Sequence, residues 1–404
     1  MDDPKFKHPR LFFLMLFSVC VVTPFGTDIF IASLPEINRV FVTESAELAV
    51  SVFLLGLAST QLFYGPLLDR FGRKPVLIGG LALYIVASIV TVLSGSIEQL
   101  LLGRFFQAAG ACGTIVSLLA IVQDIFPRQR RMAIIGAMMG MIGFCPVISP
   151  VLGSYLQVHW GWRAGFFFLL ALGIYCLALV IVVLRETTVE KKSDALDVRV
   201  IFRKYRSLLS HGRFRSYALR SCFSYAILFS YVAVSPLFLI DHFGLPVAYF
   251  GLVFATIAIP LVLMSYLAPV LTKNSSVYPM TVFAAIIMLL GAIIMVGANL
   301  VLGEGPELLV IPMLIAAFGI GAINALAGAA ALELFPAEDA GSASAMYNFF
   351  CFGGGAIFSA LISNLAGRSL LAFAVSLVVL GAAAVAAAVF PRPIEDGVVA
   401  TVAD

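Results

Sequence analysis

Charged residues are scarce in this sequence. Of its 404 residues, 12% are charged and 61% are hydrophobic, whereas a typical soluble domain carries about 25% charged residues. A soluble chain of this length needs more polar surface than this composition supplies. The composition therefore excludes a soluble globular protein and indicates a polytopic membrane protein.

Cysteine is also sparse, with six residues in the whole chain. All six lie in apolar runs, so we expect small buried hydrophobic side chains and not a disulfide framework. Basic residues exceed acidic residues by only three, which is too few to indicate a nucleic-acid partner.

Catalytic and metal-binding motifs are missing as well. The sequence has no phosphate-binding G-x-x-x-x-G-K-[ST] loop and no H-E-x-x-H motif, and its four histidines lie in expected loops, tails or span ends. No ring of charges or selectivity filter indicates a channel. We therefore expect no enzyme, no bound metal, no cofactor and no direct use of ATP.

Long apolar runs are what the sequence has in abundance. Runs near twenty residues fit the length that a helix needs to cross about 30 Å of hydrocarbon, and backbone groups inside lipid must be paired within the helix. We predict twelve spans, at about 11–34, 47–67, 76–95, 99–123, 133–156, 164–184, 217–240, 248–271, 278–300, 308–332, 342–365 and 370–390. The predicted fold class is an all-α polytopic membrane protein.

The distribution of lysine and arginine predicts the orientation. With both termini placed in the cytoplasm, the outer loops hold three of the 25 basic residues, Arg39, Arg163 and Arg368. The one long charged stretch, residues 185–216, then becomes a cytoplasmic linker. It divides the chain into two six-helix halves, 1–184 and 217–404, an arrangement common in secondary transporters.

Two charges lie inside predicted spans. Asp28 is seven residues before Pro35, and Arg104 is six residues after Glu98. At 1.5 Å per residue, both lie about 10 Å inside the outer boundary. An intramembrane charge is expensive and suggests a functional site. We therefore predict that Asp28 and Arg104 form a proton-linked site. A static buried pair, or an Arg104 that reaches to the surface, are the alternatives.

Polar side chains follow two of the spans. Gln107 and Thr114 lie on the same side of their helix as Arg104, and we predict that they line a substrate cavity. Three residues of the seventh span share one direction: Ser224, Tyr231 and Ser235. They line the cavity or bond across to neighbouring helices, and Asn324 and Asn348 are further candidates of the same kind. In the first span, Pro24 should kink the helix, because it cannot donate to the carbonyl of Cys20.

The turn after the second span carries a long motif. Residues 65–75 read Gly-Pro-Leu-Leu-Asp-Arg-Phe-Gly-Arg-Lys-Pro. This stretch resembles the G-x-L-x-D-R-x-G-R-[KR] signature of the major facilitator superfamily. The resemblance implies that Asp69, Arg70 and Arg73 form a cytoplasmic gate with Asp124, which lies at the cytoplasmic end of the fourth span. Such a cluster would hold the two halves closed on the inside.

Further motifs resemble those of the drug:proton antiporters with twelve spans. Leu101-x-x-Arg104-x-x-Gln107-x-x-Gly110 is similar to their fourth-span motif. Asp28-Ile29-Phe30 followed by Leu34-Pro35 resembles the bicyclomycin and chloramphenicol resistance branch. Residues of the fifth span resemble the antiporter motif, with Ser149 where glycine is usual before proline: Gly136, Gly140, Pro146, Pro150 and Gly153. The two motif glycines Gly136 and Gly140 should allow close helix packing.

The resemblance implies a function. We expect an efflux antiporter of the bacterial inner membrane, driven by the proton gradient, that exports small amphipathic drug-like molecules by alternating access. Its expected partners are the substrate, protons and the lipid bilayer, and we expect it to act as a monomer. The alternative is an exporter of one endogenous metabolite, such as a siderophore or an amino-acid derivative.

Overall fold

The structure is a computed structural model that describes residues 9–187, 198–273, 275–336, 339–366 and 369–389. Within these ranges every regular element is a helix. Residues 188–197 of the predicted linker and Arg368 of the predicted outer loops lie outside the described residues.

Twelve helical stretches of the described chain are long and apolar enough to cross a membrane, which confirms the predicted number. The first six are α1 (Pro9–Cys20) with α2 (Val22–Asp28), η1 (Ile31–Ser33) and α3 (Leu34–Phe41), then α4 (Leu48–Phe71), α5 (Arg73–Val92), α6 (Ile97–Ile125), α7 (Arg128–Trp160) and α8 (Arg163–Val183). The last six are α10 (Gly212–Pro236) with η2 (Leu237–His242), then α11 (Val247–Leu271), α12 (Val277–Leu302), α13 (Pro306–Glu333), α14 (Ala340–Ala366) and α15 (Leu370–Val389). A shorter helix, α9 (Val198–Ser210), lies between the two sets.

The first span is broken into four pieces, and proline explains its shape. Helix α1 ends at Cys20, as expected from Pro24, which has no N–H for the Cys20 carbonyl. Pro35 lies in the first turn of α3, where the fixed backbone angle of proline fits a helix start. The span therefore continues to Phe41, and the predicted end near residue 34 is wrong.

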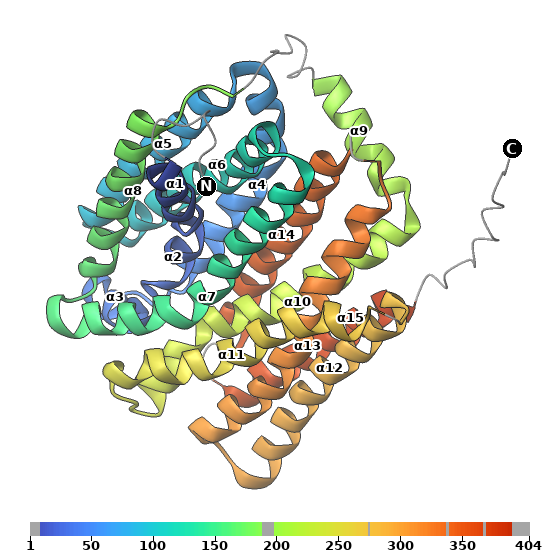
Figure 1. Ribbon diagram of the computed structural model, residues 1–404. Coiled ribbons are helices and arrows are strands. Elements are labelled where there is room, and N and C mark those ends of the chain that lie inside the picture. Colours follow the sequence, from blue (N-terminus) through green and yellow to red (C-terminus); the bar gives the residue numbers. More distant parts are fainter. Residues whose placement is uncertain (1–8, 188–197, 274, 337–338, 367–368, 390–404) are drawn as a thin grey trace, which may run out of the picture.

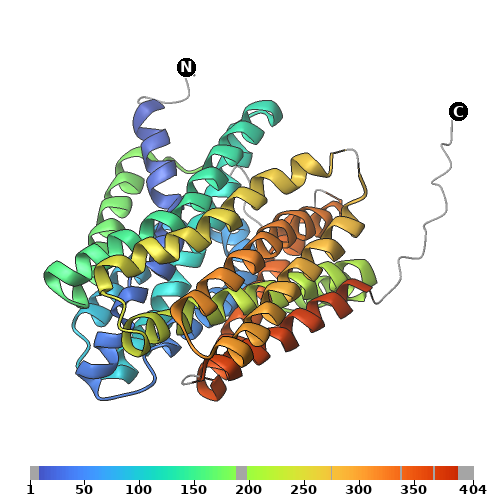
Figure 2. The same ribbon diagram turned by 90° about the horizontal axis from the view of Figure 1, so that it is seen from below.

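The six spans of each half form one group, and the two groups lie side by side (Figure 1, Figure 2). Helix α4 packs along α14, and α7 packs along α11. In the first of these seams the hydroxyl oxygens of Ser51 and Ser359 are 2.7 Å apart. In the second, the Gly251 N–H donates to Ser154 Oγ at 3.0 Å. Both halves therefore contribute to both seams.

The two ends of the bundle carry different charges. We use the name basic end for the end with Arg70, Arg73 and Lys74, at the turn between α4 and α5, and far end for the opposite one. At the far end, Arg39 of α3 forms an ion pair with Asp241 of η2 at 3.4 Å. This ion pair links the first half to the second.

Candidate functional site

Arg104 of α6 is fully enclosed, with 0% of its surface exposed. Its Nη2 donates to the carbonyl oxygen of Gly26 in α2 at 2.8 Å, and its Nη1 donates to Gln107 Oε1. Gln107 in turn donates from Nε2 to Ser88 Oγ of α5 at 2.8 Å. Arg104 therefore holds α6 to the first span and, through Gln107, to α5.

Two phenylalanine rings enclose the guanidinium group of Arg104. Its Cζ is 4.2 Å from the ring centre of Phe30 and 4.0 Å from that of Phe53. The face of an aromatic ring attracts a cation, and the attraction is larger where water is excluded. The alternative that Arg104 reaches to the surface is wrong, because the side chain ends between these rings.

Asp28 is the last residue of α2, two residues after Gly26. It is 6% exposed, and in the described part of the chain its carboxylate has no hydrogen bond and no ion pair. Arg104 reaches the carbonyl of Gly26, two residues before Asp28, but forms no ion pair with Asp28 among the described residues. A buried acid without a fixed partner is a group that can gain and lose a proton during function.

Helix α7 crosses the first span next to Asp28. Gly153 faces the backbone of Ile29, and a Cβ at residue 153 would overlap the Ile29 carbonyl oxygen. Pro146 and Pro150 lie inside the same helix. The absence of a side chain at Gly153 therefore brings α7 into direct backbone contact with the residue that follows Asp28.

The two other glycines predicted for close packing behave differently. A Cβ at Gly140 would lie 3.3 Å from the hydroxyl oxygen of Tyr266 in α11, so this glycine does lie at a tight contact between the halves. Around Gly136, a Cβ would find open space. The predicted close packing at Gly136 is wrong in this structure.

The polar residues of α6 are used for packing in this conformation. Gln107 and Thr114 are both 0% exposed. The hydroxyl of Thr114 donates to the Ala111 carbonyl at 2.7 Å and lies 3.3 Å from the hydroxyl of Thr23 in α2. These contacts hold α6 against the first span, and the lining of a substrate cavity by Gln107 and Thr114 stays a prediction.

The polar side chains that share one direction on α10 are buried as well. Ser224, Tyr231 and Ser235 are at most 1% exposed. Ser224 Oγ donates to Asn324 Oδ1 of α13 at 3.1 Å, so it bonds across to a neighbouring helix. Among the described residues, the hydroxyls of Tyr231 and Ser235 have no hydrogen-bond partner. Asn324 and Asn348 are half-buried, and the cavity role of all five stays a prediction.

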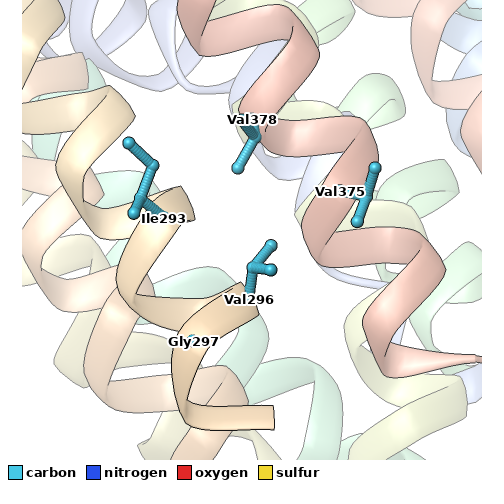
Figure 3. Close-up of a pocket in the computed structure, with 5 residues that line it drawn as sticks. All are labelled: Ile293, Val296, Gly297, Val375 and Val378. Carbon is cyan, nitrogen blue, oxygen red and sulfur yellow. The ribbon is translucent and has the colours of Figure 1, made fainter. Parts of the chain in front are cut away.

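A pocket of about 290 Å³ lies elsewhere, between α12 and α15 (Figure 3). It is lined only by apolar residues, Ile293, Val296, Gly297, Val375 and Val378. Ile293 and Val375 are about half exposed, so the pocket opens on the outer surface of the second half. It contains none of the predicted site residues and offers no polar group for orienting a substrate.

The predicted charge cluster at the basic end is present. Arg73 Nη1 donates to Asp69 Oδ1 at 3.1 Å, and Arg73 Nε donates to Asp124 Oδ2 at 3.0 Å. Arg70 was predicted as a further member, but among the described residues it makes no hydrogen bond or ion pair with Asp69 or Asp124, and its guanidinium group lies over the ring of Phe71. Asp69, Arg73 and Asp124 come from α4, α5 and α6, so these bonds join three helices of the first half. They do not connect the two halves in this structure, in contrast to the predicted role of the cluster.

The first residues after α8 complete this cluster, and the sequence analysis assigned no role to them. Glu186 accepts from the backbone N–H groups of Arg73 at 3.0 Å and Lys74 at 3.2 Å, so it caps the start of α5. Thr187 Oγ1 donates to Asp124 Oδ2 at 3.1 Å. The beginning of the linker is therefore fixed to the charge cluster.

Sequence reasoning also missed a second buried cation, Arg220 of α10, which is 1% exposed. Its Nη2 donates to Ser216 Oγ at 3.0 Å and to the Ala388 carbonyl at the end of α15 at 2.9 Å, and its Nη1 donates to Thr281 Oγ1 of α12. The predicted span begins at residue 217, which places Arg220 at a helix end in the sequence-based prediction. It joins three helices of the second half.

A buried acid outside the spans was missed too. Glu47 lies just before α4 at the far end and is 5% exposed, and its Oε2 has no partner among the described residues. Burial raises the pKa of the Glu47 carboxyl above its ordinary value, against smaller opposing contributions from hydrogen bonds to backbone and to Asn38. Nothing in the local sequence distinguishes it from the neighbouring exposed polar residues.

Comparison with known proteins identifies relatives over most of the chain. The family model described as Major Facilitator Superfamily matches residues 16–360. The multidrug resistance protein MdtL of Shewanella oneidensis is 30% identical over 65% of this chain and 66% of its own length. A bicyclomycin resistance protein homolog of Haemophilus influenzae is 26% identical over 89% of this chain and 90% of its own length.

Solved structures share the fold at low sequence identity. The crystal structure of a D-xylose-proton symporter superposes with a TM-score of 0.74 at 16% identity, covering 94% of this chain and 96% of the symporter. The xylose transporter XylE of E. coli, in a partially occluded inward open conformation, gives a TM-score of 0.71 with the same identity and coverage. The twelve spans and the family match show that the chain is a multi-pass membrane transporter and not an enzyme. Because the family model matches residues 16–360, the chain belongs to the major facilitator superfamily.

Proposed function

We propose that the protein is a proton-coupled antiporter that exports small, amphipathic, drug-like molecules by alternating access. The names of its relatives, a multidrug resistance protein and a bicyclomycin resistance protein homolog, support drug efflux. They do not favour the alternative of a single endogenous metabolite. The observation that carries proton coupling is Asp28, a buried carboxylate without a fixed partner beside the buried cation Arg104.

Proton and substrate compete at this place. A protonated carboxyl at Asp28 needs no counter-charge, whereas the carboxylate is stabilised by Arg104 or by a cationic part of a substrate. A substrate that binds from the inside therefore favours release of the proton there. A proton that binds from the outside favours release of the substrate. Arg104 can stay in place throughout, because Gly26 and Gln107 hold it independently of Asp28.

Alternating access requires that the two ends open in turn. In this structure α3 lies against η2 at the far end, where Arg39 pairs with Asp241. We place the basic end in the cytoplasm, because short loops on the cytoplasmic side carry the excess of basic residues. The cluster of Asp69, Arg73 and Asp124 then lies at the inner gate. The linker between the halves 1–184 and 217–404 was predicted as 185–216, but its last residues, 212–216, belong to α10.

The test of coupling uses the full chain in vesicles with an imposed pH gradient. A panel of cationic, neutral and zwitterionic compounds is screened for uptake that depends on the gradient. We expect Asp28→Asn to bind the transported compound with an affinity that no longer depends on pH, and to lose gradient-driven accumulation.

The matched control is Glu98→Gln, which removes an exposed carboxylate from α6, the helix that carries Arg104. This variant should keep parental transport. Full gradient-driven transport by Asp28→Asn would mean that another acid couples transport. A parent protein that binds these compounds but ignores the gradient would overturn proton coupling and leave drug binding standing.

The orientation has a separate test. All six native cysteines are buried, so one cysteine introduced at the exposed Ser210 of α9 gives a single accessible thiol. An impermeant thiol reagent added to intact cells should not label it until the membrane is opened. Labelling in intact cells would reverse the proposed topology.

A further inference from the structure

Helix α9 lies at the level where a membrane surface must be. The span that follows it, Gly212–His242, has 31 residues, which corresponds to about 46 Å at 1.5 Å per residue. A bilayer with its headgroups is about 40–45 Å thick. The start of α10 therefore lies among the headgroups of the leaflet at the basic end. Helix α9 ends at Ser210, only two residues earlier, and it lies beside α14 at this end of the bundle (Figure 1).

One face of α9 is fixed to the bundle. Pro66 inside α4 has no N–H for the Leu62 carbonyl, and Tyr205 supplies the missing donor: its hydroxyl donates to Leu62 O at 2.9 Å. Lys204 forms an ion pair with Asp339 at 2.9 Å, and Leu208 is 3% exposed. Because Leu62 lies nine residues before the end of α4, α9 rests on the flank of the bundle and not beyond its end.

The opposite face of α9 is basic and carries an exposed aromatic ring. Phe202 is 68% exposed, and Arg203 and Arg206 are exposed beside it. At 100° per residue, Arg206 lies about 40° from Phe202 in one direction around the helix, whereas Tyr205 lies about 60° and Leu208 about 120° from it in the other direction. In the part of the chain that the structure describes, neither Arg203 nor Arg206 has a hydrogen bond or ion pair. The helix contains no acidic residue.

We propose that α9 is a membrane-surface helix whose exposed face binds the headgroups of anionic phospholipids, with Arg203 and Arg206 as the headgroup ligands and Phe202 inserted at the boundary with the acyl chains. Basic amphipathic helices with exposed aromatic residues bind at this depth. Each basic side chain near an anionic surface contributes about fivefold to the attraction. The proposal does not depend on which molecule is transported.

The experiment places a single fluorophore on this face in the full chain. The two native tryptophans are removed by Trp160→Phe and Trp162→Phe, and Phe202→Trp introduces the reporter. The protein is reconstituted in two vesicle preparations of identical phosphatidylglycerol and phosphatidylcholine content. In one preparation the phosphatidylglycerol carries brominated acyl chains that quench tryptophan, and in the other the same mole fraction of phosphatidylcholine carries them.

We expect stronger quenching by brominated phosphatidylglycerol, and a weaker preference at high salt. Arg203→Gln combined with Arg206→Gln should make the two lipids quench equally. Lys273→Gln, at an exposed basic residue at the same end beyond α11, is the control and should leave the preference unchanged.

Two results with the reporter protein alone would overturn the proposal, so it does not depend on the arginine variants folding. Equal quenching by the two lipids would mean that Phe202 contacts lipid without headgroup selection. No quenching by either lipid would mean that this face points away from the membrane and suits a soluble acidic partner.

Discussion

Arg104→Lys separates the charge of Arg104 from its shape. Lysine keeps the positive charge beside Asp28 but has a single nitrogen at its tip, whereas the guanidinium group presents a planar fork of donors. In the structure the guanidinium group donates to Gln107 Oε1 and to the Gly26 carbonyl at the same time. Its flat face lies between the rings of Phe30 and Phe53. If charge alone mattered, lysine would suffice.

The loss of stability in Arg104→Lys can be estimated from the hydrogen-bond acceptor that loses its donor. A lysine at residue 104 cannot reach both acceptors from between the rings of Phe30 and Phe53, so either Gln107 or the Gly26 carbonyl loses its charged donor. Hydrogen bonds to charged groups contribute about 1.5–3 kcal/mol. Since 1.4 kcal/mol is about tenfold in an equilibrium, we expect losses of roughly 10-fold to 150-fold in the stability of the contact between α6 and α2, or between α6 and α5, depending on which acceptor is left.

The assays are unfolding of the purified protein in detergent and gradient-driven uptake in vesicles. Arg104→Lys should lower the free energy of unfolding by about 1.5–3 kcal/mol and reduce transport strongly. Arg70→Lys is the matched control: Arg70 is exposed, so its substitution should stay within about 0.5 kcal/mol. If Arg104→Lys kept the stability and transport of the parent, the two hydrogen bonds of the guanidinium group would not matter and the charge alone would suffice.

Three further substitutions test other contacts. Gly153→Ala should cost about 1–3 kcal/mol in thermal unfolding and impair transport, because its Cβ would overlap the Ile29 carbonyl. Tyr205→Phe should lower the free energy of unfolding by about 1–3 kcal/mol, because it leaves the Leu62 carbonyl unpaired. Burial raises the pKa of Tyr205 to about 12, so the hydroxyl is neutral and donates at working pH. The difference in stability between variant and parent should therefore shrink only as the pH rises toward that value. Val42→Gly should raise the free energy of unfolding by up to about 1 kcal/mol, because Val42 is exposed and has a φ of 51°, which is costly for a β-branched residue.

Each of these has an outcome that would contradict it. Gly153→Ala with parental stability would mean that α7 moves away from the first span at no cost. A Tyr205→Phe variant that differs from the parent only at alkaline pH would contradict a hydrogen bond made by the neutral hydroxyl. A destabilised Val42→Gly variant would mean that the entropy of the unfolded chain outweighs the strain at this turn.

Much of the fold was predictable because lipid imposes simple rules. A backbone inside lipid must pair with itself, so each apolar run near twenty residues becomes a helix, and the number of twelve spans followed from hydropathy. The break after Cys20 followed from Pro24. Proline also caused the main error in the first span, because the same residue type ends some helices and begins others, and only the neighbouring structure decides that Pro35 begins α3.

The charged residues of the site could be predicted from the sequence, but the side chains that contact them could not. Asp28 and Arg104 could be singled out because charge is rare at this depth. The enclosure of Arg104 by Phe30 and Phe53 depends on how three spans cross, which a single sequence does not encode locally. Arg220 was missed for a related reason: its charge is balanced by hydroxyls and by the end of α15, far away in the sequence.

The ion pair between Arg39 and Asp241 is strongly exposed, with 67% and 42% of the two side chains open to solvent. Such a pair contributes about 0–1 kcal/mol, so it can favour the joined far end by no more than about fivefold. A buried pair would cost about 3–5 kcal/mol to break by loss of one partner and would slow every reopening by orders of magnitude. Under the proposed alternating access these two surfaces separate in each turnover, and a weak contact keeps that separation fast. The separation should then depend on the salt concentration at the far end, because salt screens an exposed ion pair.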